Sequence, residues 1–276
     1  MIPAGRTFYK MSGSGNDFVM IDARVESAGD LDRPEWVRAV CARGTGIGAD
    51  GVVFLEPSSA AALRIRYLNS DGSLAALCGN ATLCSARLAV ELGAAEKAGF
   101  SIETDAGVLP ARFVDGRPEI DLESVTEVVA DDSRVRLADG ESRAGFVLAG
   151  VPHVVIRVAD IESVDVVGRG GPIRRDRSFR QGANVNFVSP GKGGPWRMRT
   201  YERGVEAETL ACGTGAVAAA VLLNEWGEAG LTVPLETKSG QTLRVRLVRD
   251  GGSWRPSLSG SARIVYQGVL GELETL

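Results

Sequence analysis

The chain has 276 residues, with 31 Lys and Arg against 35 Asp and Glu, a formal net charge of −4 and 44% hydrophobic residues. These values are ordinary for a globular protein of about two domains, and they exclude a disordered or fibrous chain and a polyanion-binding surface. No apolar run approaches the roughly 20 residues of a membrane-spanning helix, and the start MIPAGRTFYK lacks a signal-peptide core, so we expect a cytoplasmic protein without nucleic-acid or membrane partners.

The counts of histidine and cysteine limit the kinds of active site that the chain can form. Histidine occurs once, at His153, which excludes a site built from several imidazoles, and we expect no metal. Four cysteines without a C-x-x-C pair are typical of reduced thiols. Cys41 and Cys84 are expected in the core, whereas Cys78 and Cys212 stand in a sequence context that occurs twice.

Hydrophobic periodicity predicts three helices and a series of short strands. The first helix is expected over Arg33–Ala42, with Asp32 as its cap and Pro34 in its first turn. The other two, Asn80–Leu92 and Thr214–Trp226, are largely apolar and should be deeply buried. Alternating strands are predicted at Phe18–Ile21, Val52–Leu55, Arg64–Leu68, Ala111–Val114, Glu119–Leu122, Val154–Val158, Asn186–Val188 and Arg197–Tyr201. Turns are predicted at PGKGGPW (190–196) and GGSWRPSLSG (251–260).

The chain repeats itself at a spacing of about 134 residues. GNDFVMID (15–22) shares its apolar pattern with GVPHVVIR (150–157), and GAD (48–50) pairs with GAN (182–184). A longer stretch, YLNSDGSLAALCGN from Tyr67, aligns with YERGVEAETLACGTG from Tyr201. A fourth block, IETDAG from Ile102, pairs with LETKSG from Leu235. Four blocks in one order indicate an internal duplication.

This duplication predicts an α+β fold of two similar domains, each a mixed, mostly antiparallel sheet or barrel wrapped around a central helix. The boundary is expected near residue 125, in the polar stretch DLESVTEVVADDS. The domains are then 1–124, completed by 264–276, and 125–263, with the active site in the cleft between them.

Each half places a cysteine directly before a glycine-rich helix start, at Cys78-Gly79-Asn80 and Cys212-Gly213-Thr214. The positive end of the helix dipole lowers the pKa of a thiol there, and the exposed backbone N–H groups suit a carboxylate. Two such thiols around one carboxylate provide what stereoinversion of an amino acid requires without pyridoxal phosphate. One thiolate removes the Cα proton, and the other thiol returns a proton from the opposite face.

The blocks MSGSGNDFVMID, GIGADG, NSDGSLAALCGN, GANVNF and YERGVEAETLACGTG resemble the diaminopimelate epimerase family over most of the chain. The resemblance implies a cofactor-independent isomerase that interconverts LL- and meso-2,6-diaminopimelate for lysine and peptidoglycan precursor synthesis. It also implies two similar domains and a homodimer, with a small amino-acid substrate as the partner.

Carried over by position, the resemblance assigns Cys78 and Cys212 as the acid/base pair, with His153 and Glu202 beside the thiols as catalytic groups. Arg203 is expected at the distal end of the substrate. The implied substrate-binding residues are Asn16, Asn69, Gly79, Asn80, Asn184, Glu202, Arg203, Gly213 and Thr214.

Three departures from the family pattern bear on the substrate. Val151 replaces an asparagine, Leu83 stands where the family has an arginine, and the segment before Cys212 holds one additional residue. A cofactor-independent racemase of another amino acid is therefore an alternative. A dinucleotide-binding oxidoreductase is a second one, because Gly46–Gly51 fits G-x-G-x-x-G and Gly213–Ala218 fits G-x-G-x-x-A.

Overall fold

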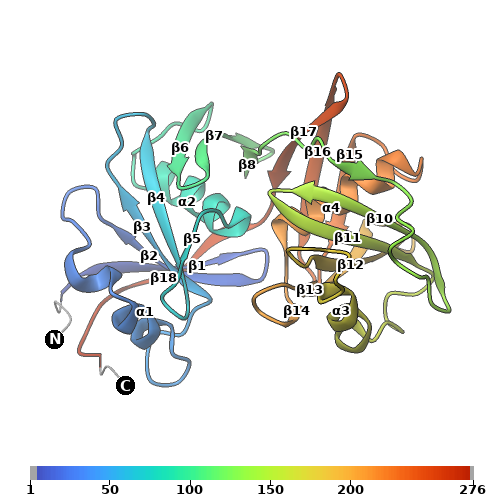
Figure 1. The fold of residues 1–276 in the computed structure, drawn as a ribbon. Helices are drawn as coiled ribbons and strands as arrows, with labels where there is room; N and C mark the ends of the chain where they lie inside the picture. The colour runs from blue at the N-terminus through green and yellow to red at the C-terminus, as the bar shows by residue number, and fades with distance from the viewer. Residues whose placement is uncertain (1–4, 274–276) are drawn as a thin grey trace. The chain divides into compact units, whose positions relative to one another are not determined.

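The computed structural model describes residues 5–273, which divide into two compact units (Figure 1). The N-terminal unit comprises the chain up to Ile120 together with the segment from Gly260, and the C-terminal unit is Asp121–Ser259. The sequence placed these junctions at 124/125 and 263/264.

The N-terminal unit is a mixed sheet in the order β18-β1-β2-β3-β4-β6-β7-β8. The pairs β2–β3 and β4–β6 are parallel, and the others are antiparallel. Its strands are β1 (Thr7–Gly13), β2 (Asn16–Asp22), β3 (Gly51–Glu56), β4 (Leu63–Asn69), β5 (Leu74–Ala75), β6 (Phe100–Thr104), β7 (Gly107–Val114), β8 (Arg117–Asp121) and β18 (Ala262–Val269). Its helices are η1 (Gly29–Asp32), α1 (Pro34–Cys41) and α2 (Gly79–Glu91).

The C-terminal unit follows the same plan in the order β9-β10-β11-β12-β13-β15-β16-β17. The pairs β11–β12 and β13–β15 are parallel, matching the two parallel pairs of the N-terminal unit. Its strands are β9 (Val128–Val129), β10 (Glu141–Ala149), β11 (Val151–Val158), β12 (Asn184–Ser189), β13 (Trp196–Glu202), β14 (Ala207–Thr209), β15 (Thr232–Glu236), β16 (Thr242–Asp250) and β17 (Ser253–Ser259). Its helices are α3 (Val166–Arg174) and α4 (Gly213–Glu225). The duplicated α+β fold predicted from the sequence is confirmed.

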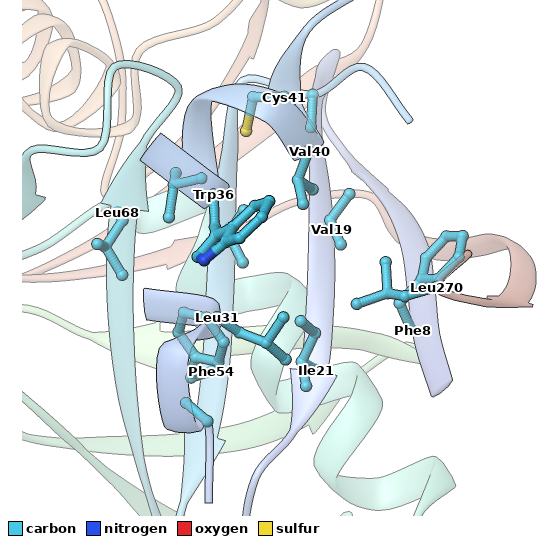
Figure 2. Packing of buried hydrophobic residues seen from close by; sticks show 14 of the residues in the cluster. Phe8, Val19, Ile21, Leu31, Trp36, Val40, Cys41, Phe54, Leu68 and Leu270 are labelled. Atoms are coloured by element: carbon cyan, nitrogen blue, oxygen red, sulfur yellow. The ribbon is translucent and has the colours of Figure 1, made fainter. Parts of the chain in front are cut away.

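Each unit buries one central helix against one face of its sheet and packs a second helix on the other face. In the N-terminal unit, Val19 and Ile21 of β2 alternate with residues that face α2, and they pack with Trp36 of α1 (Figure 2). Cys41 lies in the same apolar cluster (Figure 2), which confirms its predicted place in the core. In the C-terminal unit, α4 contacts β10, β11, β12 and β16 (Figure 1).

The predicted central helices are confirmed, each beginning and ending one residue earlier than expected. Asp32 does not cap α1, because the N-cap position is Arg33 and Asp32 ends the preceding helix η1. The Asp32 carboxylate instead accepts a hydrogen bond from Arg66 at 2.8 Å. The helix α3 was not predicted, because its sequence VVGRGGPIR is rich in helix-breaking residues. It forms with Asp165 as N-cap and with Gly170 packed against Tyr201.

The prediction of a turn over residues 251–260 is wrong from Ser253 onward. Residues Ser253–Ser259 form β17, which pairs along its whole length with β16. The period of the strand is carried by Trp254, Pro256 and Leu258, all buried, and the serines and arginine between them hid it. The predicted turn at 190–196 connects β12 to β13.

Candidate active site

Both central helices begin at a cysteine in the same backbone conformation. Cys78 is the N-cap of α2 with φ −132° and ψ 113°, and Cys212 is the N-cap of α4 with φ −133° and ψ 112°. Each thiol therefore lies at the positive end of a buried helix, where backbone N–H groups have no partner within the helix. Cys78 is partly exposed and Cys212 is 6% exposed.

The first turn of α4 is shaped around the sulfur of Cys212. The Gly215 N–H donates to Cys212 Sγ at 3.4 Å, and Thr214 Oγ1 lies 3.6 Å from the same sulfur. A Cβ at position 215 would lie 3.2 Å from Sγ and 2.3 Å from Asn186 Oδ1. Glycine at this position therefore lets both groups approach the helix start.

At the start of α2, two predicted asparagines are joined by a hydrogen bond. Asn80 Nδ2 donates to Asn16 Oδ1 at 2.7 Å, and Asn16 Nδ2 donates to Asp50 Oδ2 at 2.9 Å. Asn80 Oδ1 is buried and has no hydrogen-bond partner among the described residues. Because an unsatisfied buried acceptor costs about 1–3 kcal/mol, this oxygen suits the ammonium group of an amino acid.

Asp50 belongs to a charged cluster that the sequence did not indicate as part of the site. Arg43 bridges Asp50 and Asp17, and Lys10 donates to Asp17 at 2.6 Å. Burial raises the pKa of Asp17, but the hydrogen bonds from Arg43 and Lys10 outweigh burial and hold that pKa below 3.8. The cluster thus fixes the loop that orients Asn16. The repeat offered a signal, since Asp50 aligns with Asn184 in the GAD and GAN blocks.

In the C-terminal unit, polar side chains occupy the face of β11, β12 and β13 that lies toward α4. His153 pairs with Asn184 in the parallel register of β11 and β12. Asn184 accepts a hydrogen bond from the backbone N–H of Arg203, at 2.7 Å from Oδ1. Glu202 ends β13 one residue beyond the Val185–Tyr201 pair and thus adjoins Asn184. His153, Asn184 and Glu202 are brought together at one end of the sheet.

His153 is fully buried, and burial together with the positive charge of Arg203 lowers its pKa to about 3. Its Nδ1 lies 3.2 Å from Nδ2 of Asn186, and its Nε2 is buried without a hydrogen-bond partner among the described residues. Asn186 was not among the predicted site residues, although the period of a strand places it on the same face as Asn184.

Two predicted substrate contacts, Asn69 and Arg203, make hydrogen bonds within their own unit. Asn69 Nδ2 donates to Ser73 Oγ at 3.0 Å within its own turn. Arg203 Nη1 donates to the backbone oxygen of Gln181 at 2.8 Å. Both residues sit at or just after a strand end that leads toward a cysteine.

The segment from Arg203 to Cys212, which departs from the family spacing, begins with the turn after β13. The two units themselves have equal spacing here, because Tyr67 to Cys78 and Tyr201 to Cys212 both span 11 positions. Glu206 adopts a positive φ of 58° there. Its carboxylate accepts from the Gly204 N–H at 3.1 Å and from Arg174 Nε at 2.8 Å. The turn is thereby tied to α3.

Neither glycine motif has the setting of a dinucleotide site. Gly46–Gly51 leads into the strand β3, not into a helix. Gly213–Ala218 opens α4, but the strand directly before it, β14, is antiparallel to β13 whereas β15 after it is parallel to β13, so α4 does not directly join two parallel strands. No helix within residues 5–273 has the length and apolarity to cross a membrane.

The sequence profile of a family described as diaminopimelate epimerase matches residues 8–127 and 145–265. A diaminopimelate epimerase of Gemmatimonas aurantiaca is 46% identical over 97% of this chain and 100% of that protein. A diaminopimelate epimerase of Archaeoglobus fulgidus is 39% identical over 95% of each chain.

Solved structures share the fold at low sequence identity. A phenazine biosynthesis protein of the PhzF family from Bacillus anthracis matches with a TM-score of 0.74 and 17% identity over 97% of this chain and 99% of that chain. A hydroxyproline epimerase from Agrobacterium vitis matches with a TM-score of 0.68 and 17% identity over 97% of this chain and 93% of that chain.

Proposed function

The chain belongs to the diaminopimelate epimerase family, and from this premise we propose that it interconverts LL-2,6-diaminopimelate and meso-diaminopimelate through two cysteines. The observation that carries the proposal is the matched pair of N-cap cysteines, Cys78 and Cys212, one on each central helix. The protein is then an isomerase that works without pyridoxal phosphate or another cofactor.

The reaction inverts one Cα of the substrate by proton transfer on opposite faces. The thiolate of one cysteine removes the Cα proton, and the thiol of the other delivers a proton from the opposite side. The negative charge that develops at Cα and its carboxylate is stabilised by backbone N–H groups at the two helix starts. Gly79 and Asn80 supply these groups on α2, and Gly213 and Thr214 supply them on α4.

The remaining residues hold the substrate and the thiols. Asn16 and Asn80, already joined by a hydrogen bond, bind near the reacting centre. Asn69, Asn184 and Arg203 bind the distal amino-acid end, where a guanidinium suits a second carboxylate. His153 and Glu202 lie beside the thiols and act on their proton transfers. Arg203 then exchanges its bond to Gln181 for the substrate carboxylate.

In the cell, this activity serves lysine and peptidoglycan precursor synthesis in the cytoplasm, with no nucleic-acid or membrane partner. The proposed assembly is a homodimer. Val265 and Val269 of β18 are 54% and 62% exposed, and such side chains on a sheet favour contact with a second copy. Sedimentation equilibrium tests this, since a monomeric mass at working concentration excludes the dimer.

Deuterium exchange tests the two-thiol mechanism. Purified protein incubated with LL-diaminopimelate in D2O, without added cofactor, should form meso product with one deuterium at the inverted Cα. At early times the remaining LL substrate should carry none, because the abstracted proton and the delivered deuteron occupy different sulfur atoms. Equal early deuteration of both epimers would indicate a single base and contradict the mechanism.

Cysteine substitutions identify the two bases. Cys78→Ala and Cys212→Ala should each lower the rate of epimerisation by a factor of about 10³ or more, because the remaining thiol cannot transfer a proton on the opposite face of Cα. Cys41→Ala is the matched control, since it removes a buried thiol in the α1 core. Near-normal turnover in either of the first two variants would overturn the assignment.

A further inference from the structure

We propose that Asn186 is a positioning residue that fixes the tautomer of His153, holding the imidazole neutral with its proton on Nε2 as a hydrogen-bond donor for the reaction site. Nothing in the sequence motifs assigns a role to Asn186 or to its neighbour Thr200. The proposal deepens the proposed function, because it states which atom of His153 faces the chemistry and what holds it there.

The orientation of the Asn186 amide is determined by its partners. One nitrogen hydrogen is donated to the backbone oxygen of Val154, which can only accept, at 3.0 Å. The opposite side of the amide accepts a hydrogen bond from Thr200 Oγ1 at 2.9 Å. Because Asn186 is fully buried and Thr200 is 2% exposed, no solvent competes for these bonds. The amide therefore presents its nitrogen, not its oxygen, to His153.

This orientation dictates where the imidazole carries its proton. The second hydrogen of Asn186 Nδ2 faces His153 Nδ1 at 3.2 Å, so Nδ1 must offer a lone pair. In a neutral ring the proton then resides on Nε2. That N–H is buried without a partner among the described residues. A buried donor left unsatisfied is destabilising, and an anionic acceptor such as a thiolate or a substrate carboxylate removes this cost.

The Asn186 side chain also lies near the first turn of α4, as Cys212 does. The position that a Cβ would occupy at Gly215 lies 2.3 Å from Asn186 Oδ1 and 3.2 Å from Cys212 Sγ. The Asn186 carboxamide and the sulfur thus lie against the same turn of the helix. Asn184, on the same face of β12, is bonded to the Arg203 N–H instead and does not share this role.

The duplicated unit shows that the fold itself does not require these polar groups. By strand pairing, the place of His153–Asn184 is taken in the other unit by Phe18–Gly51, and that of Asn186–Thr200 by Val53–Tyr67. This correspondence is one residue out of step with the sequence repeat, which aligns Tyr67 with Tyr201. There the same positions form an apolar layer, in which the Phe18 and Tyr67 rings meet edge to face at 5.8 Å. A polar triad in only one of two equivalent cores indicates a functional role.

The single histidine makes the tautomer directly measurable. Long-range 1H–15N NMR of the ring, recorded without substrate, should show a protonated Nε2 and an unprotonated Nδ1 in the wild-type protein. In Asn186→Asp, the carboxylate can only accept, so the proton should move to Nδ1. Its kcat should fall by about 10-fold or more with little change in KM, as for other groups that orient a reacting residue.

Two further variants complete the experiment. Thr200→Val, which leaves Asn186 in place, should give a mixed tautomer signal and a smaller loss of kcat. Ser85→Ala removes a buried hydroxyl that bonds only to its own helix in α2, and it should change neither the ring spectrum nor kcat. A wild-type ring protonated on Nδ1, or an Asn186→Asp protein with unchanged kcat, would overturn the proposal. The ring spectrum is recorded without substrate. The tautomer can therefore be determined even if the protein proves to have no epimerase activity, so the two proposals can fail separately.

Discussion

His153 carries a measurable pH dependence of stability. Burial, together with the charge of Arg203, lowers its pKa from 6.5 to about 3, so the folded chain leaves this ring unprotonated where the unfolded chain binds a proton. An excess of protons on the unfolded chain makes the free energy of unfolding rise with pH. The contribution of His153 to the unfolding free energy is therefore fully present above about pH 6.5 and is lost as the pH falls toward 3.

His153→Gln tests this dependence. Between about pH 6 and pH 4, the unfolding free energy of the wild-type protein should fall more steeply than that of the variant, by up to about 1.4 kcal/mol per pH unit. Urea unfolding at a series of pH values measures both slopes. Carboxylates with lowered pKa values, such as Asp17, occur in both proteins and cancel in the comparison. Parallel curves would mean that the ring is not held neutral.

The four cysteines should differ in their reaction with an alkylating agent. Burial raises the pKa of Cys41 to about 12, and burial with the nearby charge of Cys78 raises the pKa of Cys84 further above its ordinary value. Both should resist iodoacetamide at mildly alkaline pH until the chain unfolds, because the thiolate is the nucleophile. Peptide mass mapping should find Cys78 modified first. Rapid labelling of Cys84 in the folded protein would contradict its burial.

At the scale of the elements, the first turn of α4 depends on one glycine. Gly215→Ala should weaken the enzyme although alanine favours helices, since the new Cβ would lie 2.3 Å from Asn186 Oδ1. We expect a loss of about 1–3 kcal/mol in unfolding free energy and a marked loss of kcat. Gly230→Ala, where a Cβ meets nothing within 4 Å, is the control. Thermal melts and initial rates compare the two variants. A Gly215→Ala protein that is more stable than the wild type and fully active would contradict the close packing at position 215.

Elements with a clear period could be predicted from the sequence, and those formed by tertiary packing could not. The central helices followed from apolar residues behind Cys78 and Cys212. The helix α3 escaped prediction because glycine at position 170 is required by close contact with Tyr201, not by helix propensity. For the same reason, the link from Asn186 to the thiol could not be foreseen, since it depends on how α4 lies on β12.

At the scale of the whole molecule, one plan of strands and one buried helix is used twice with different interiors. The cysteines at the two helix starts have the same conformation, whereas the layers beneath them are apolar around Phe18 and polar around His153. The duplication thus explains why two equivalent thiols exist. Because one layer is apolar and the other polar, the two thiols have different surroundings. Such an asymmetry is compatible with a reaction whose substrate and product are different epimers.

Oxidative cross-linking tests the central claim that Cys78 and Cys212 exchange protons with the same substrate Cα from opposite faces. Two sulfur atoms that reach opposite faces of a single Cα should come within bonding range when the ligand is absent. Mild oxidant should then give a tryptic pair containing both residues, with loss of activity that a reductant restores. Substrate should protect against the reaction. A Cys78–Cys84 link in its place, or full oxidation of both thiols without any link between them, would contradict the account.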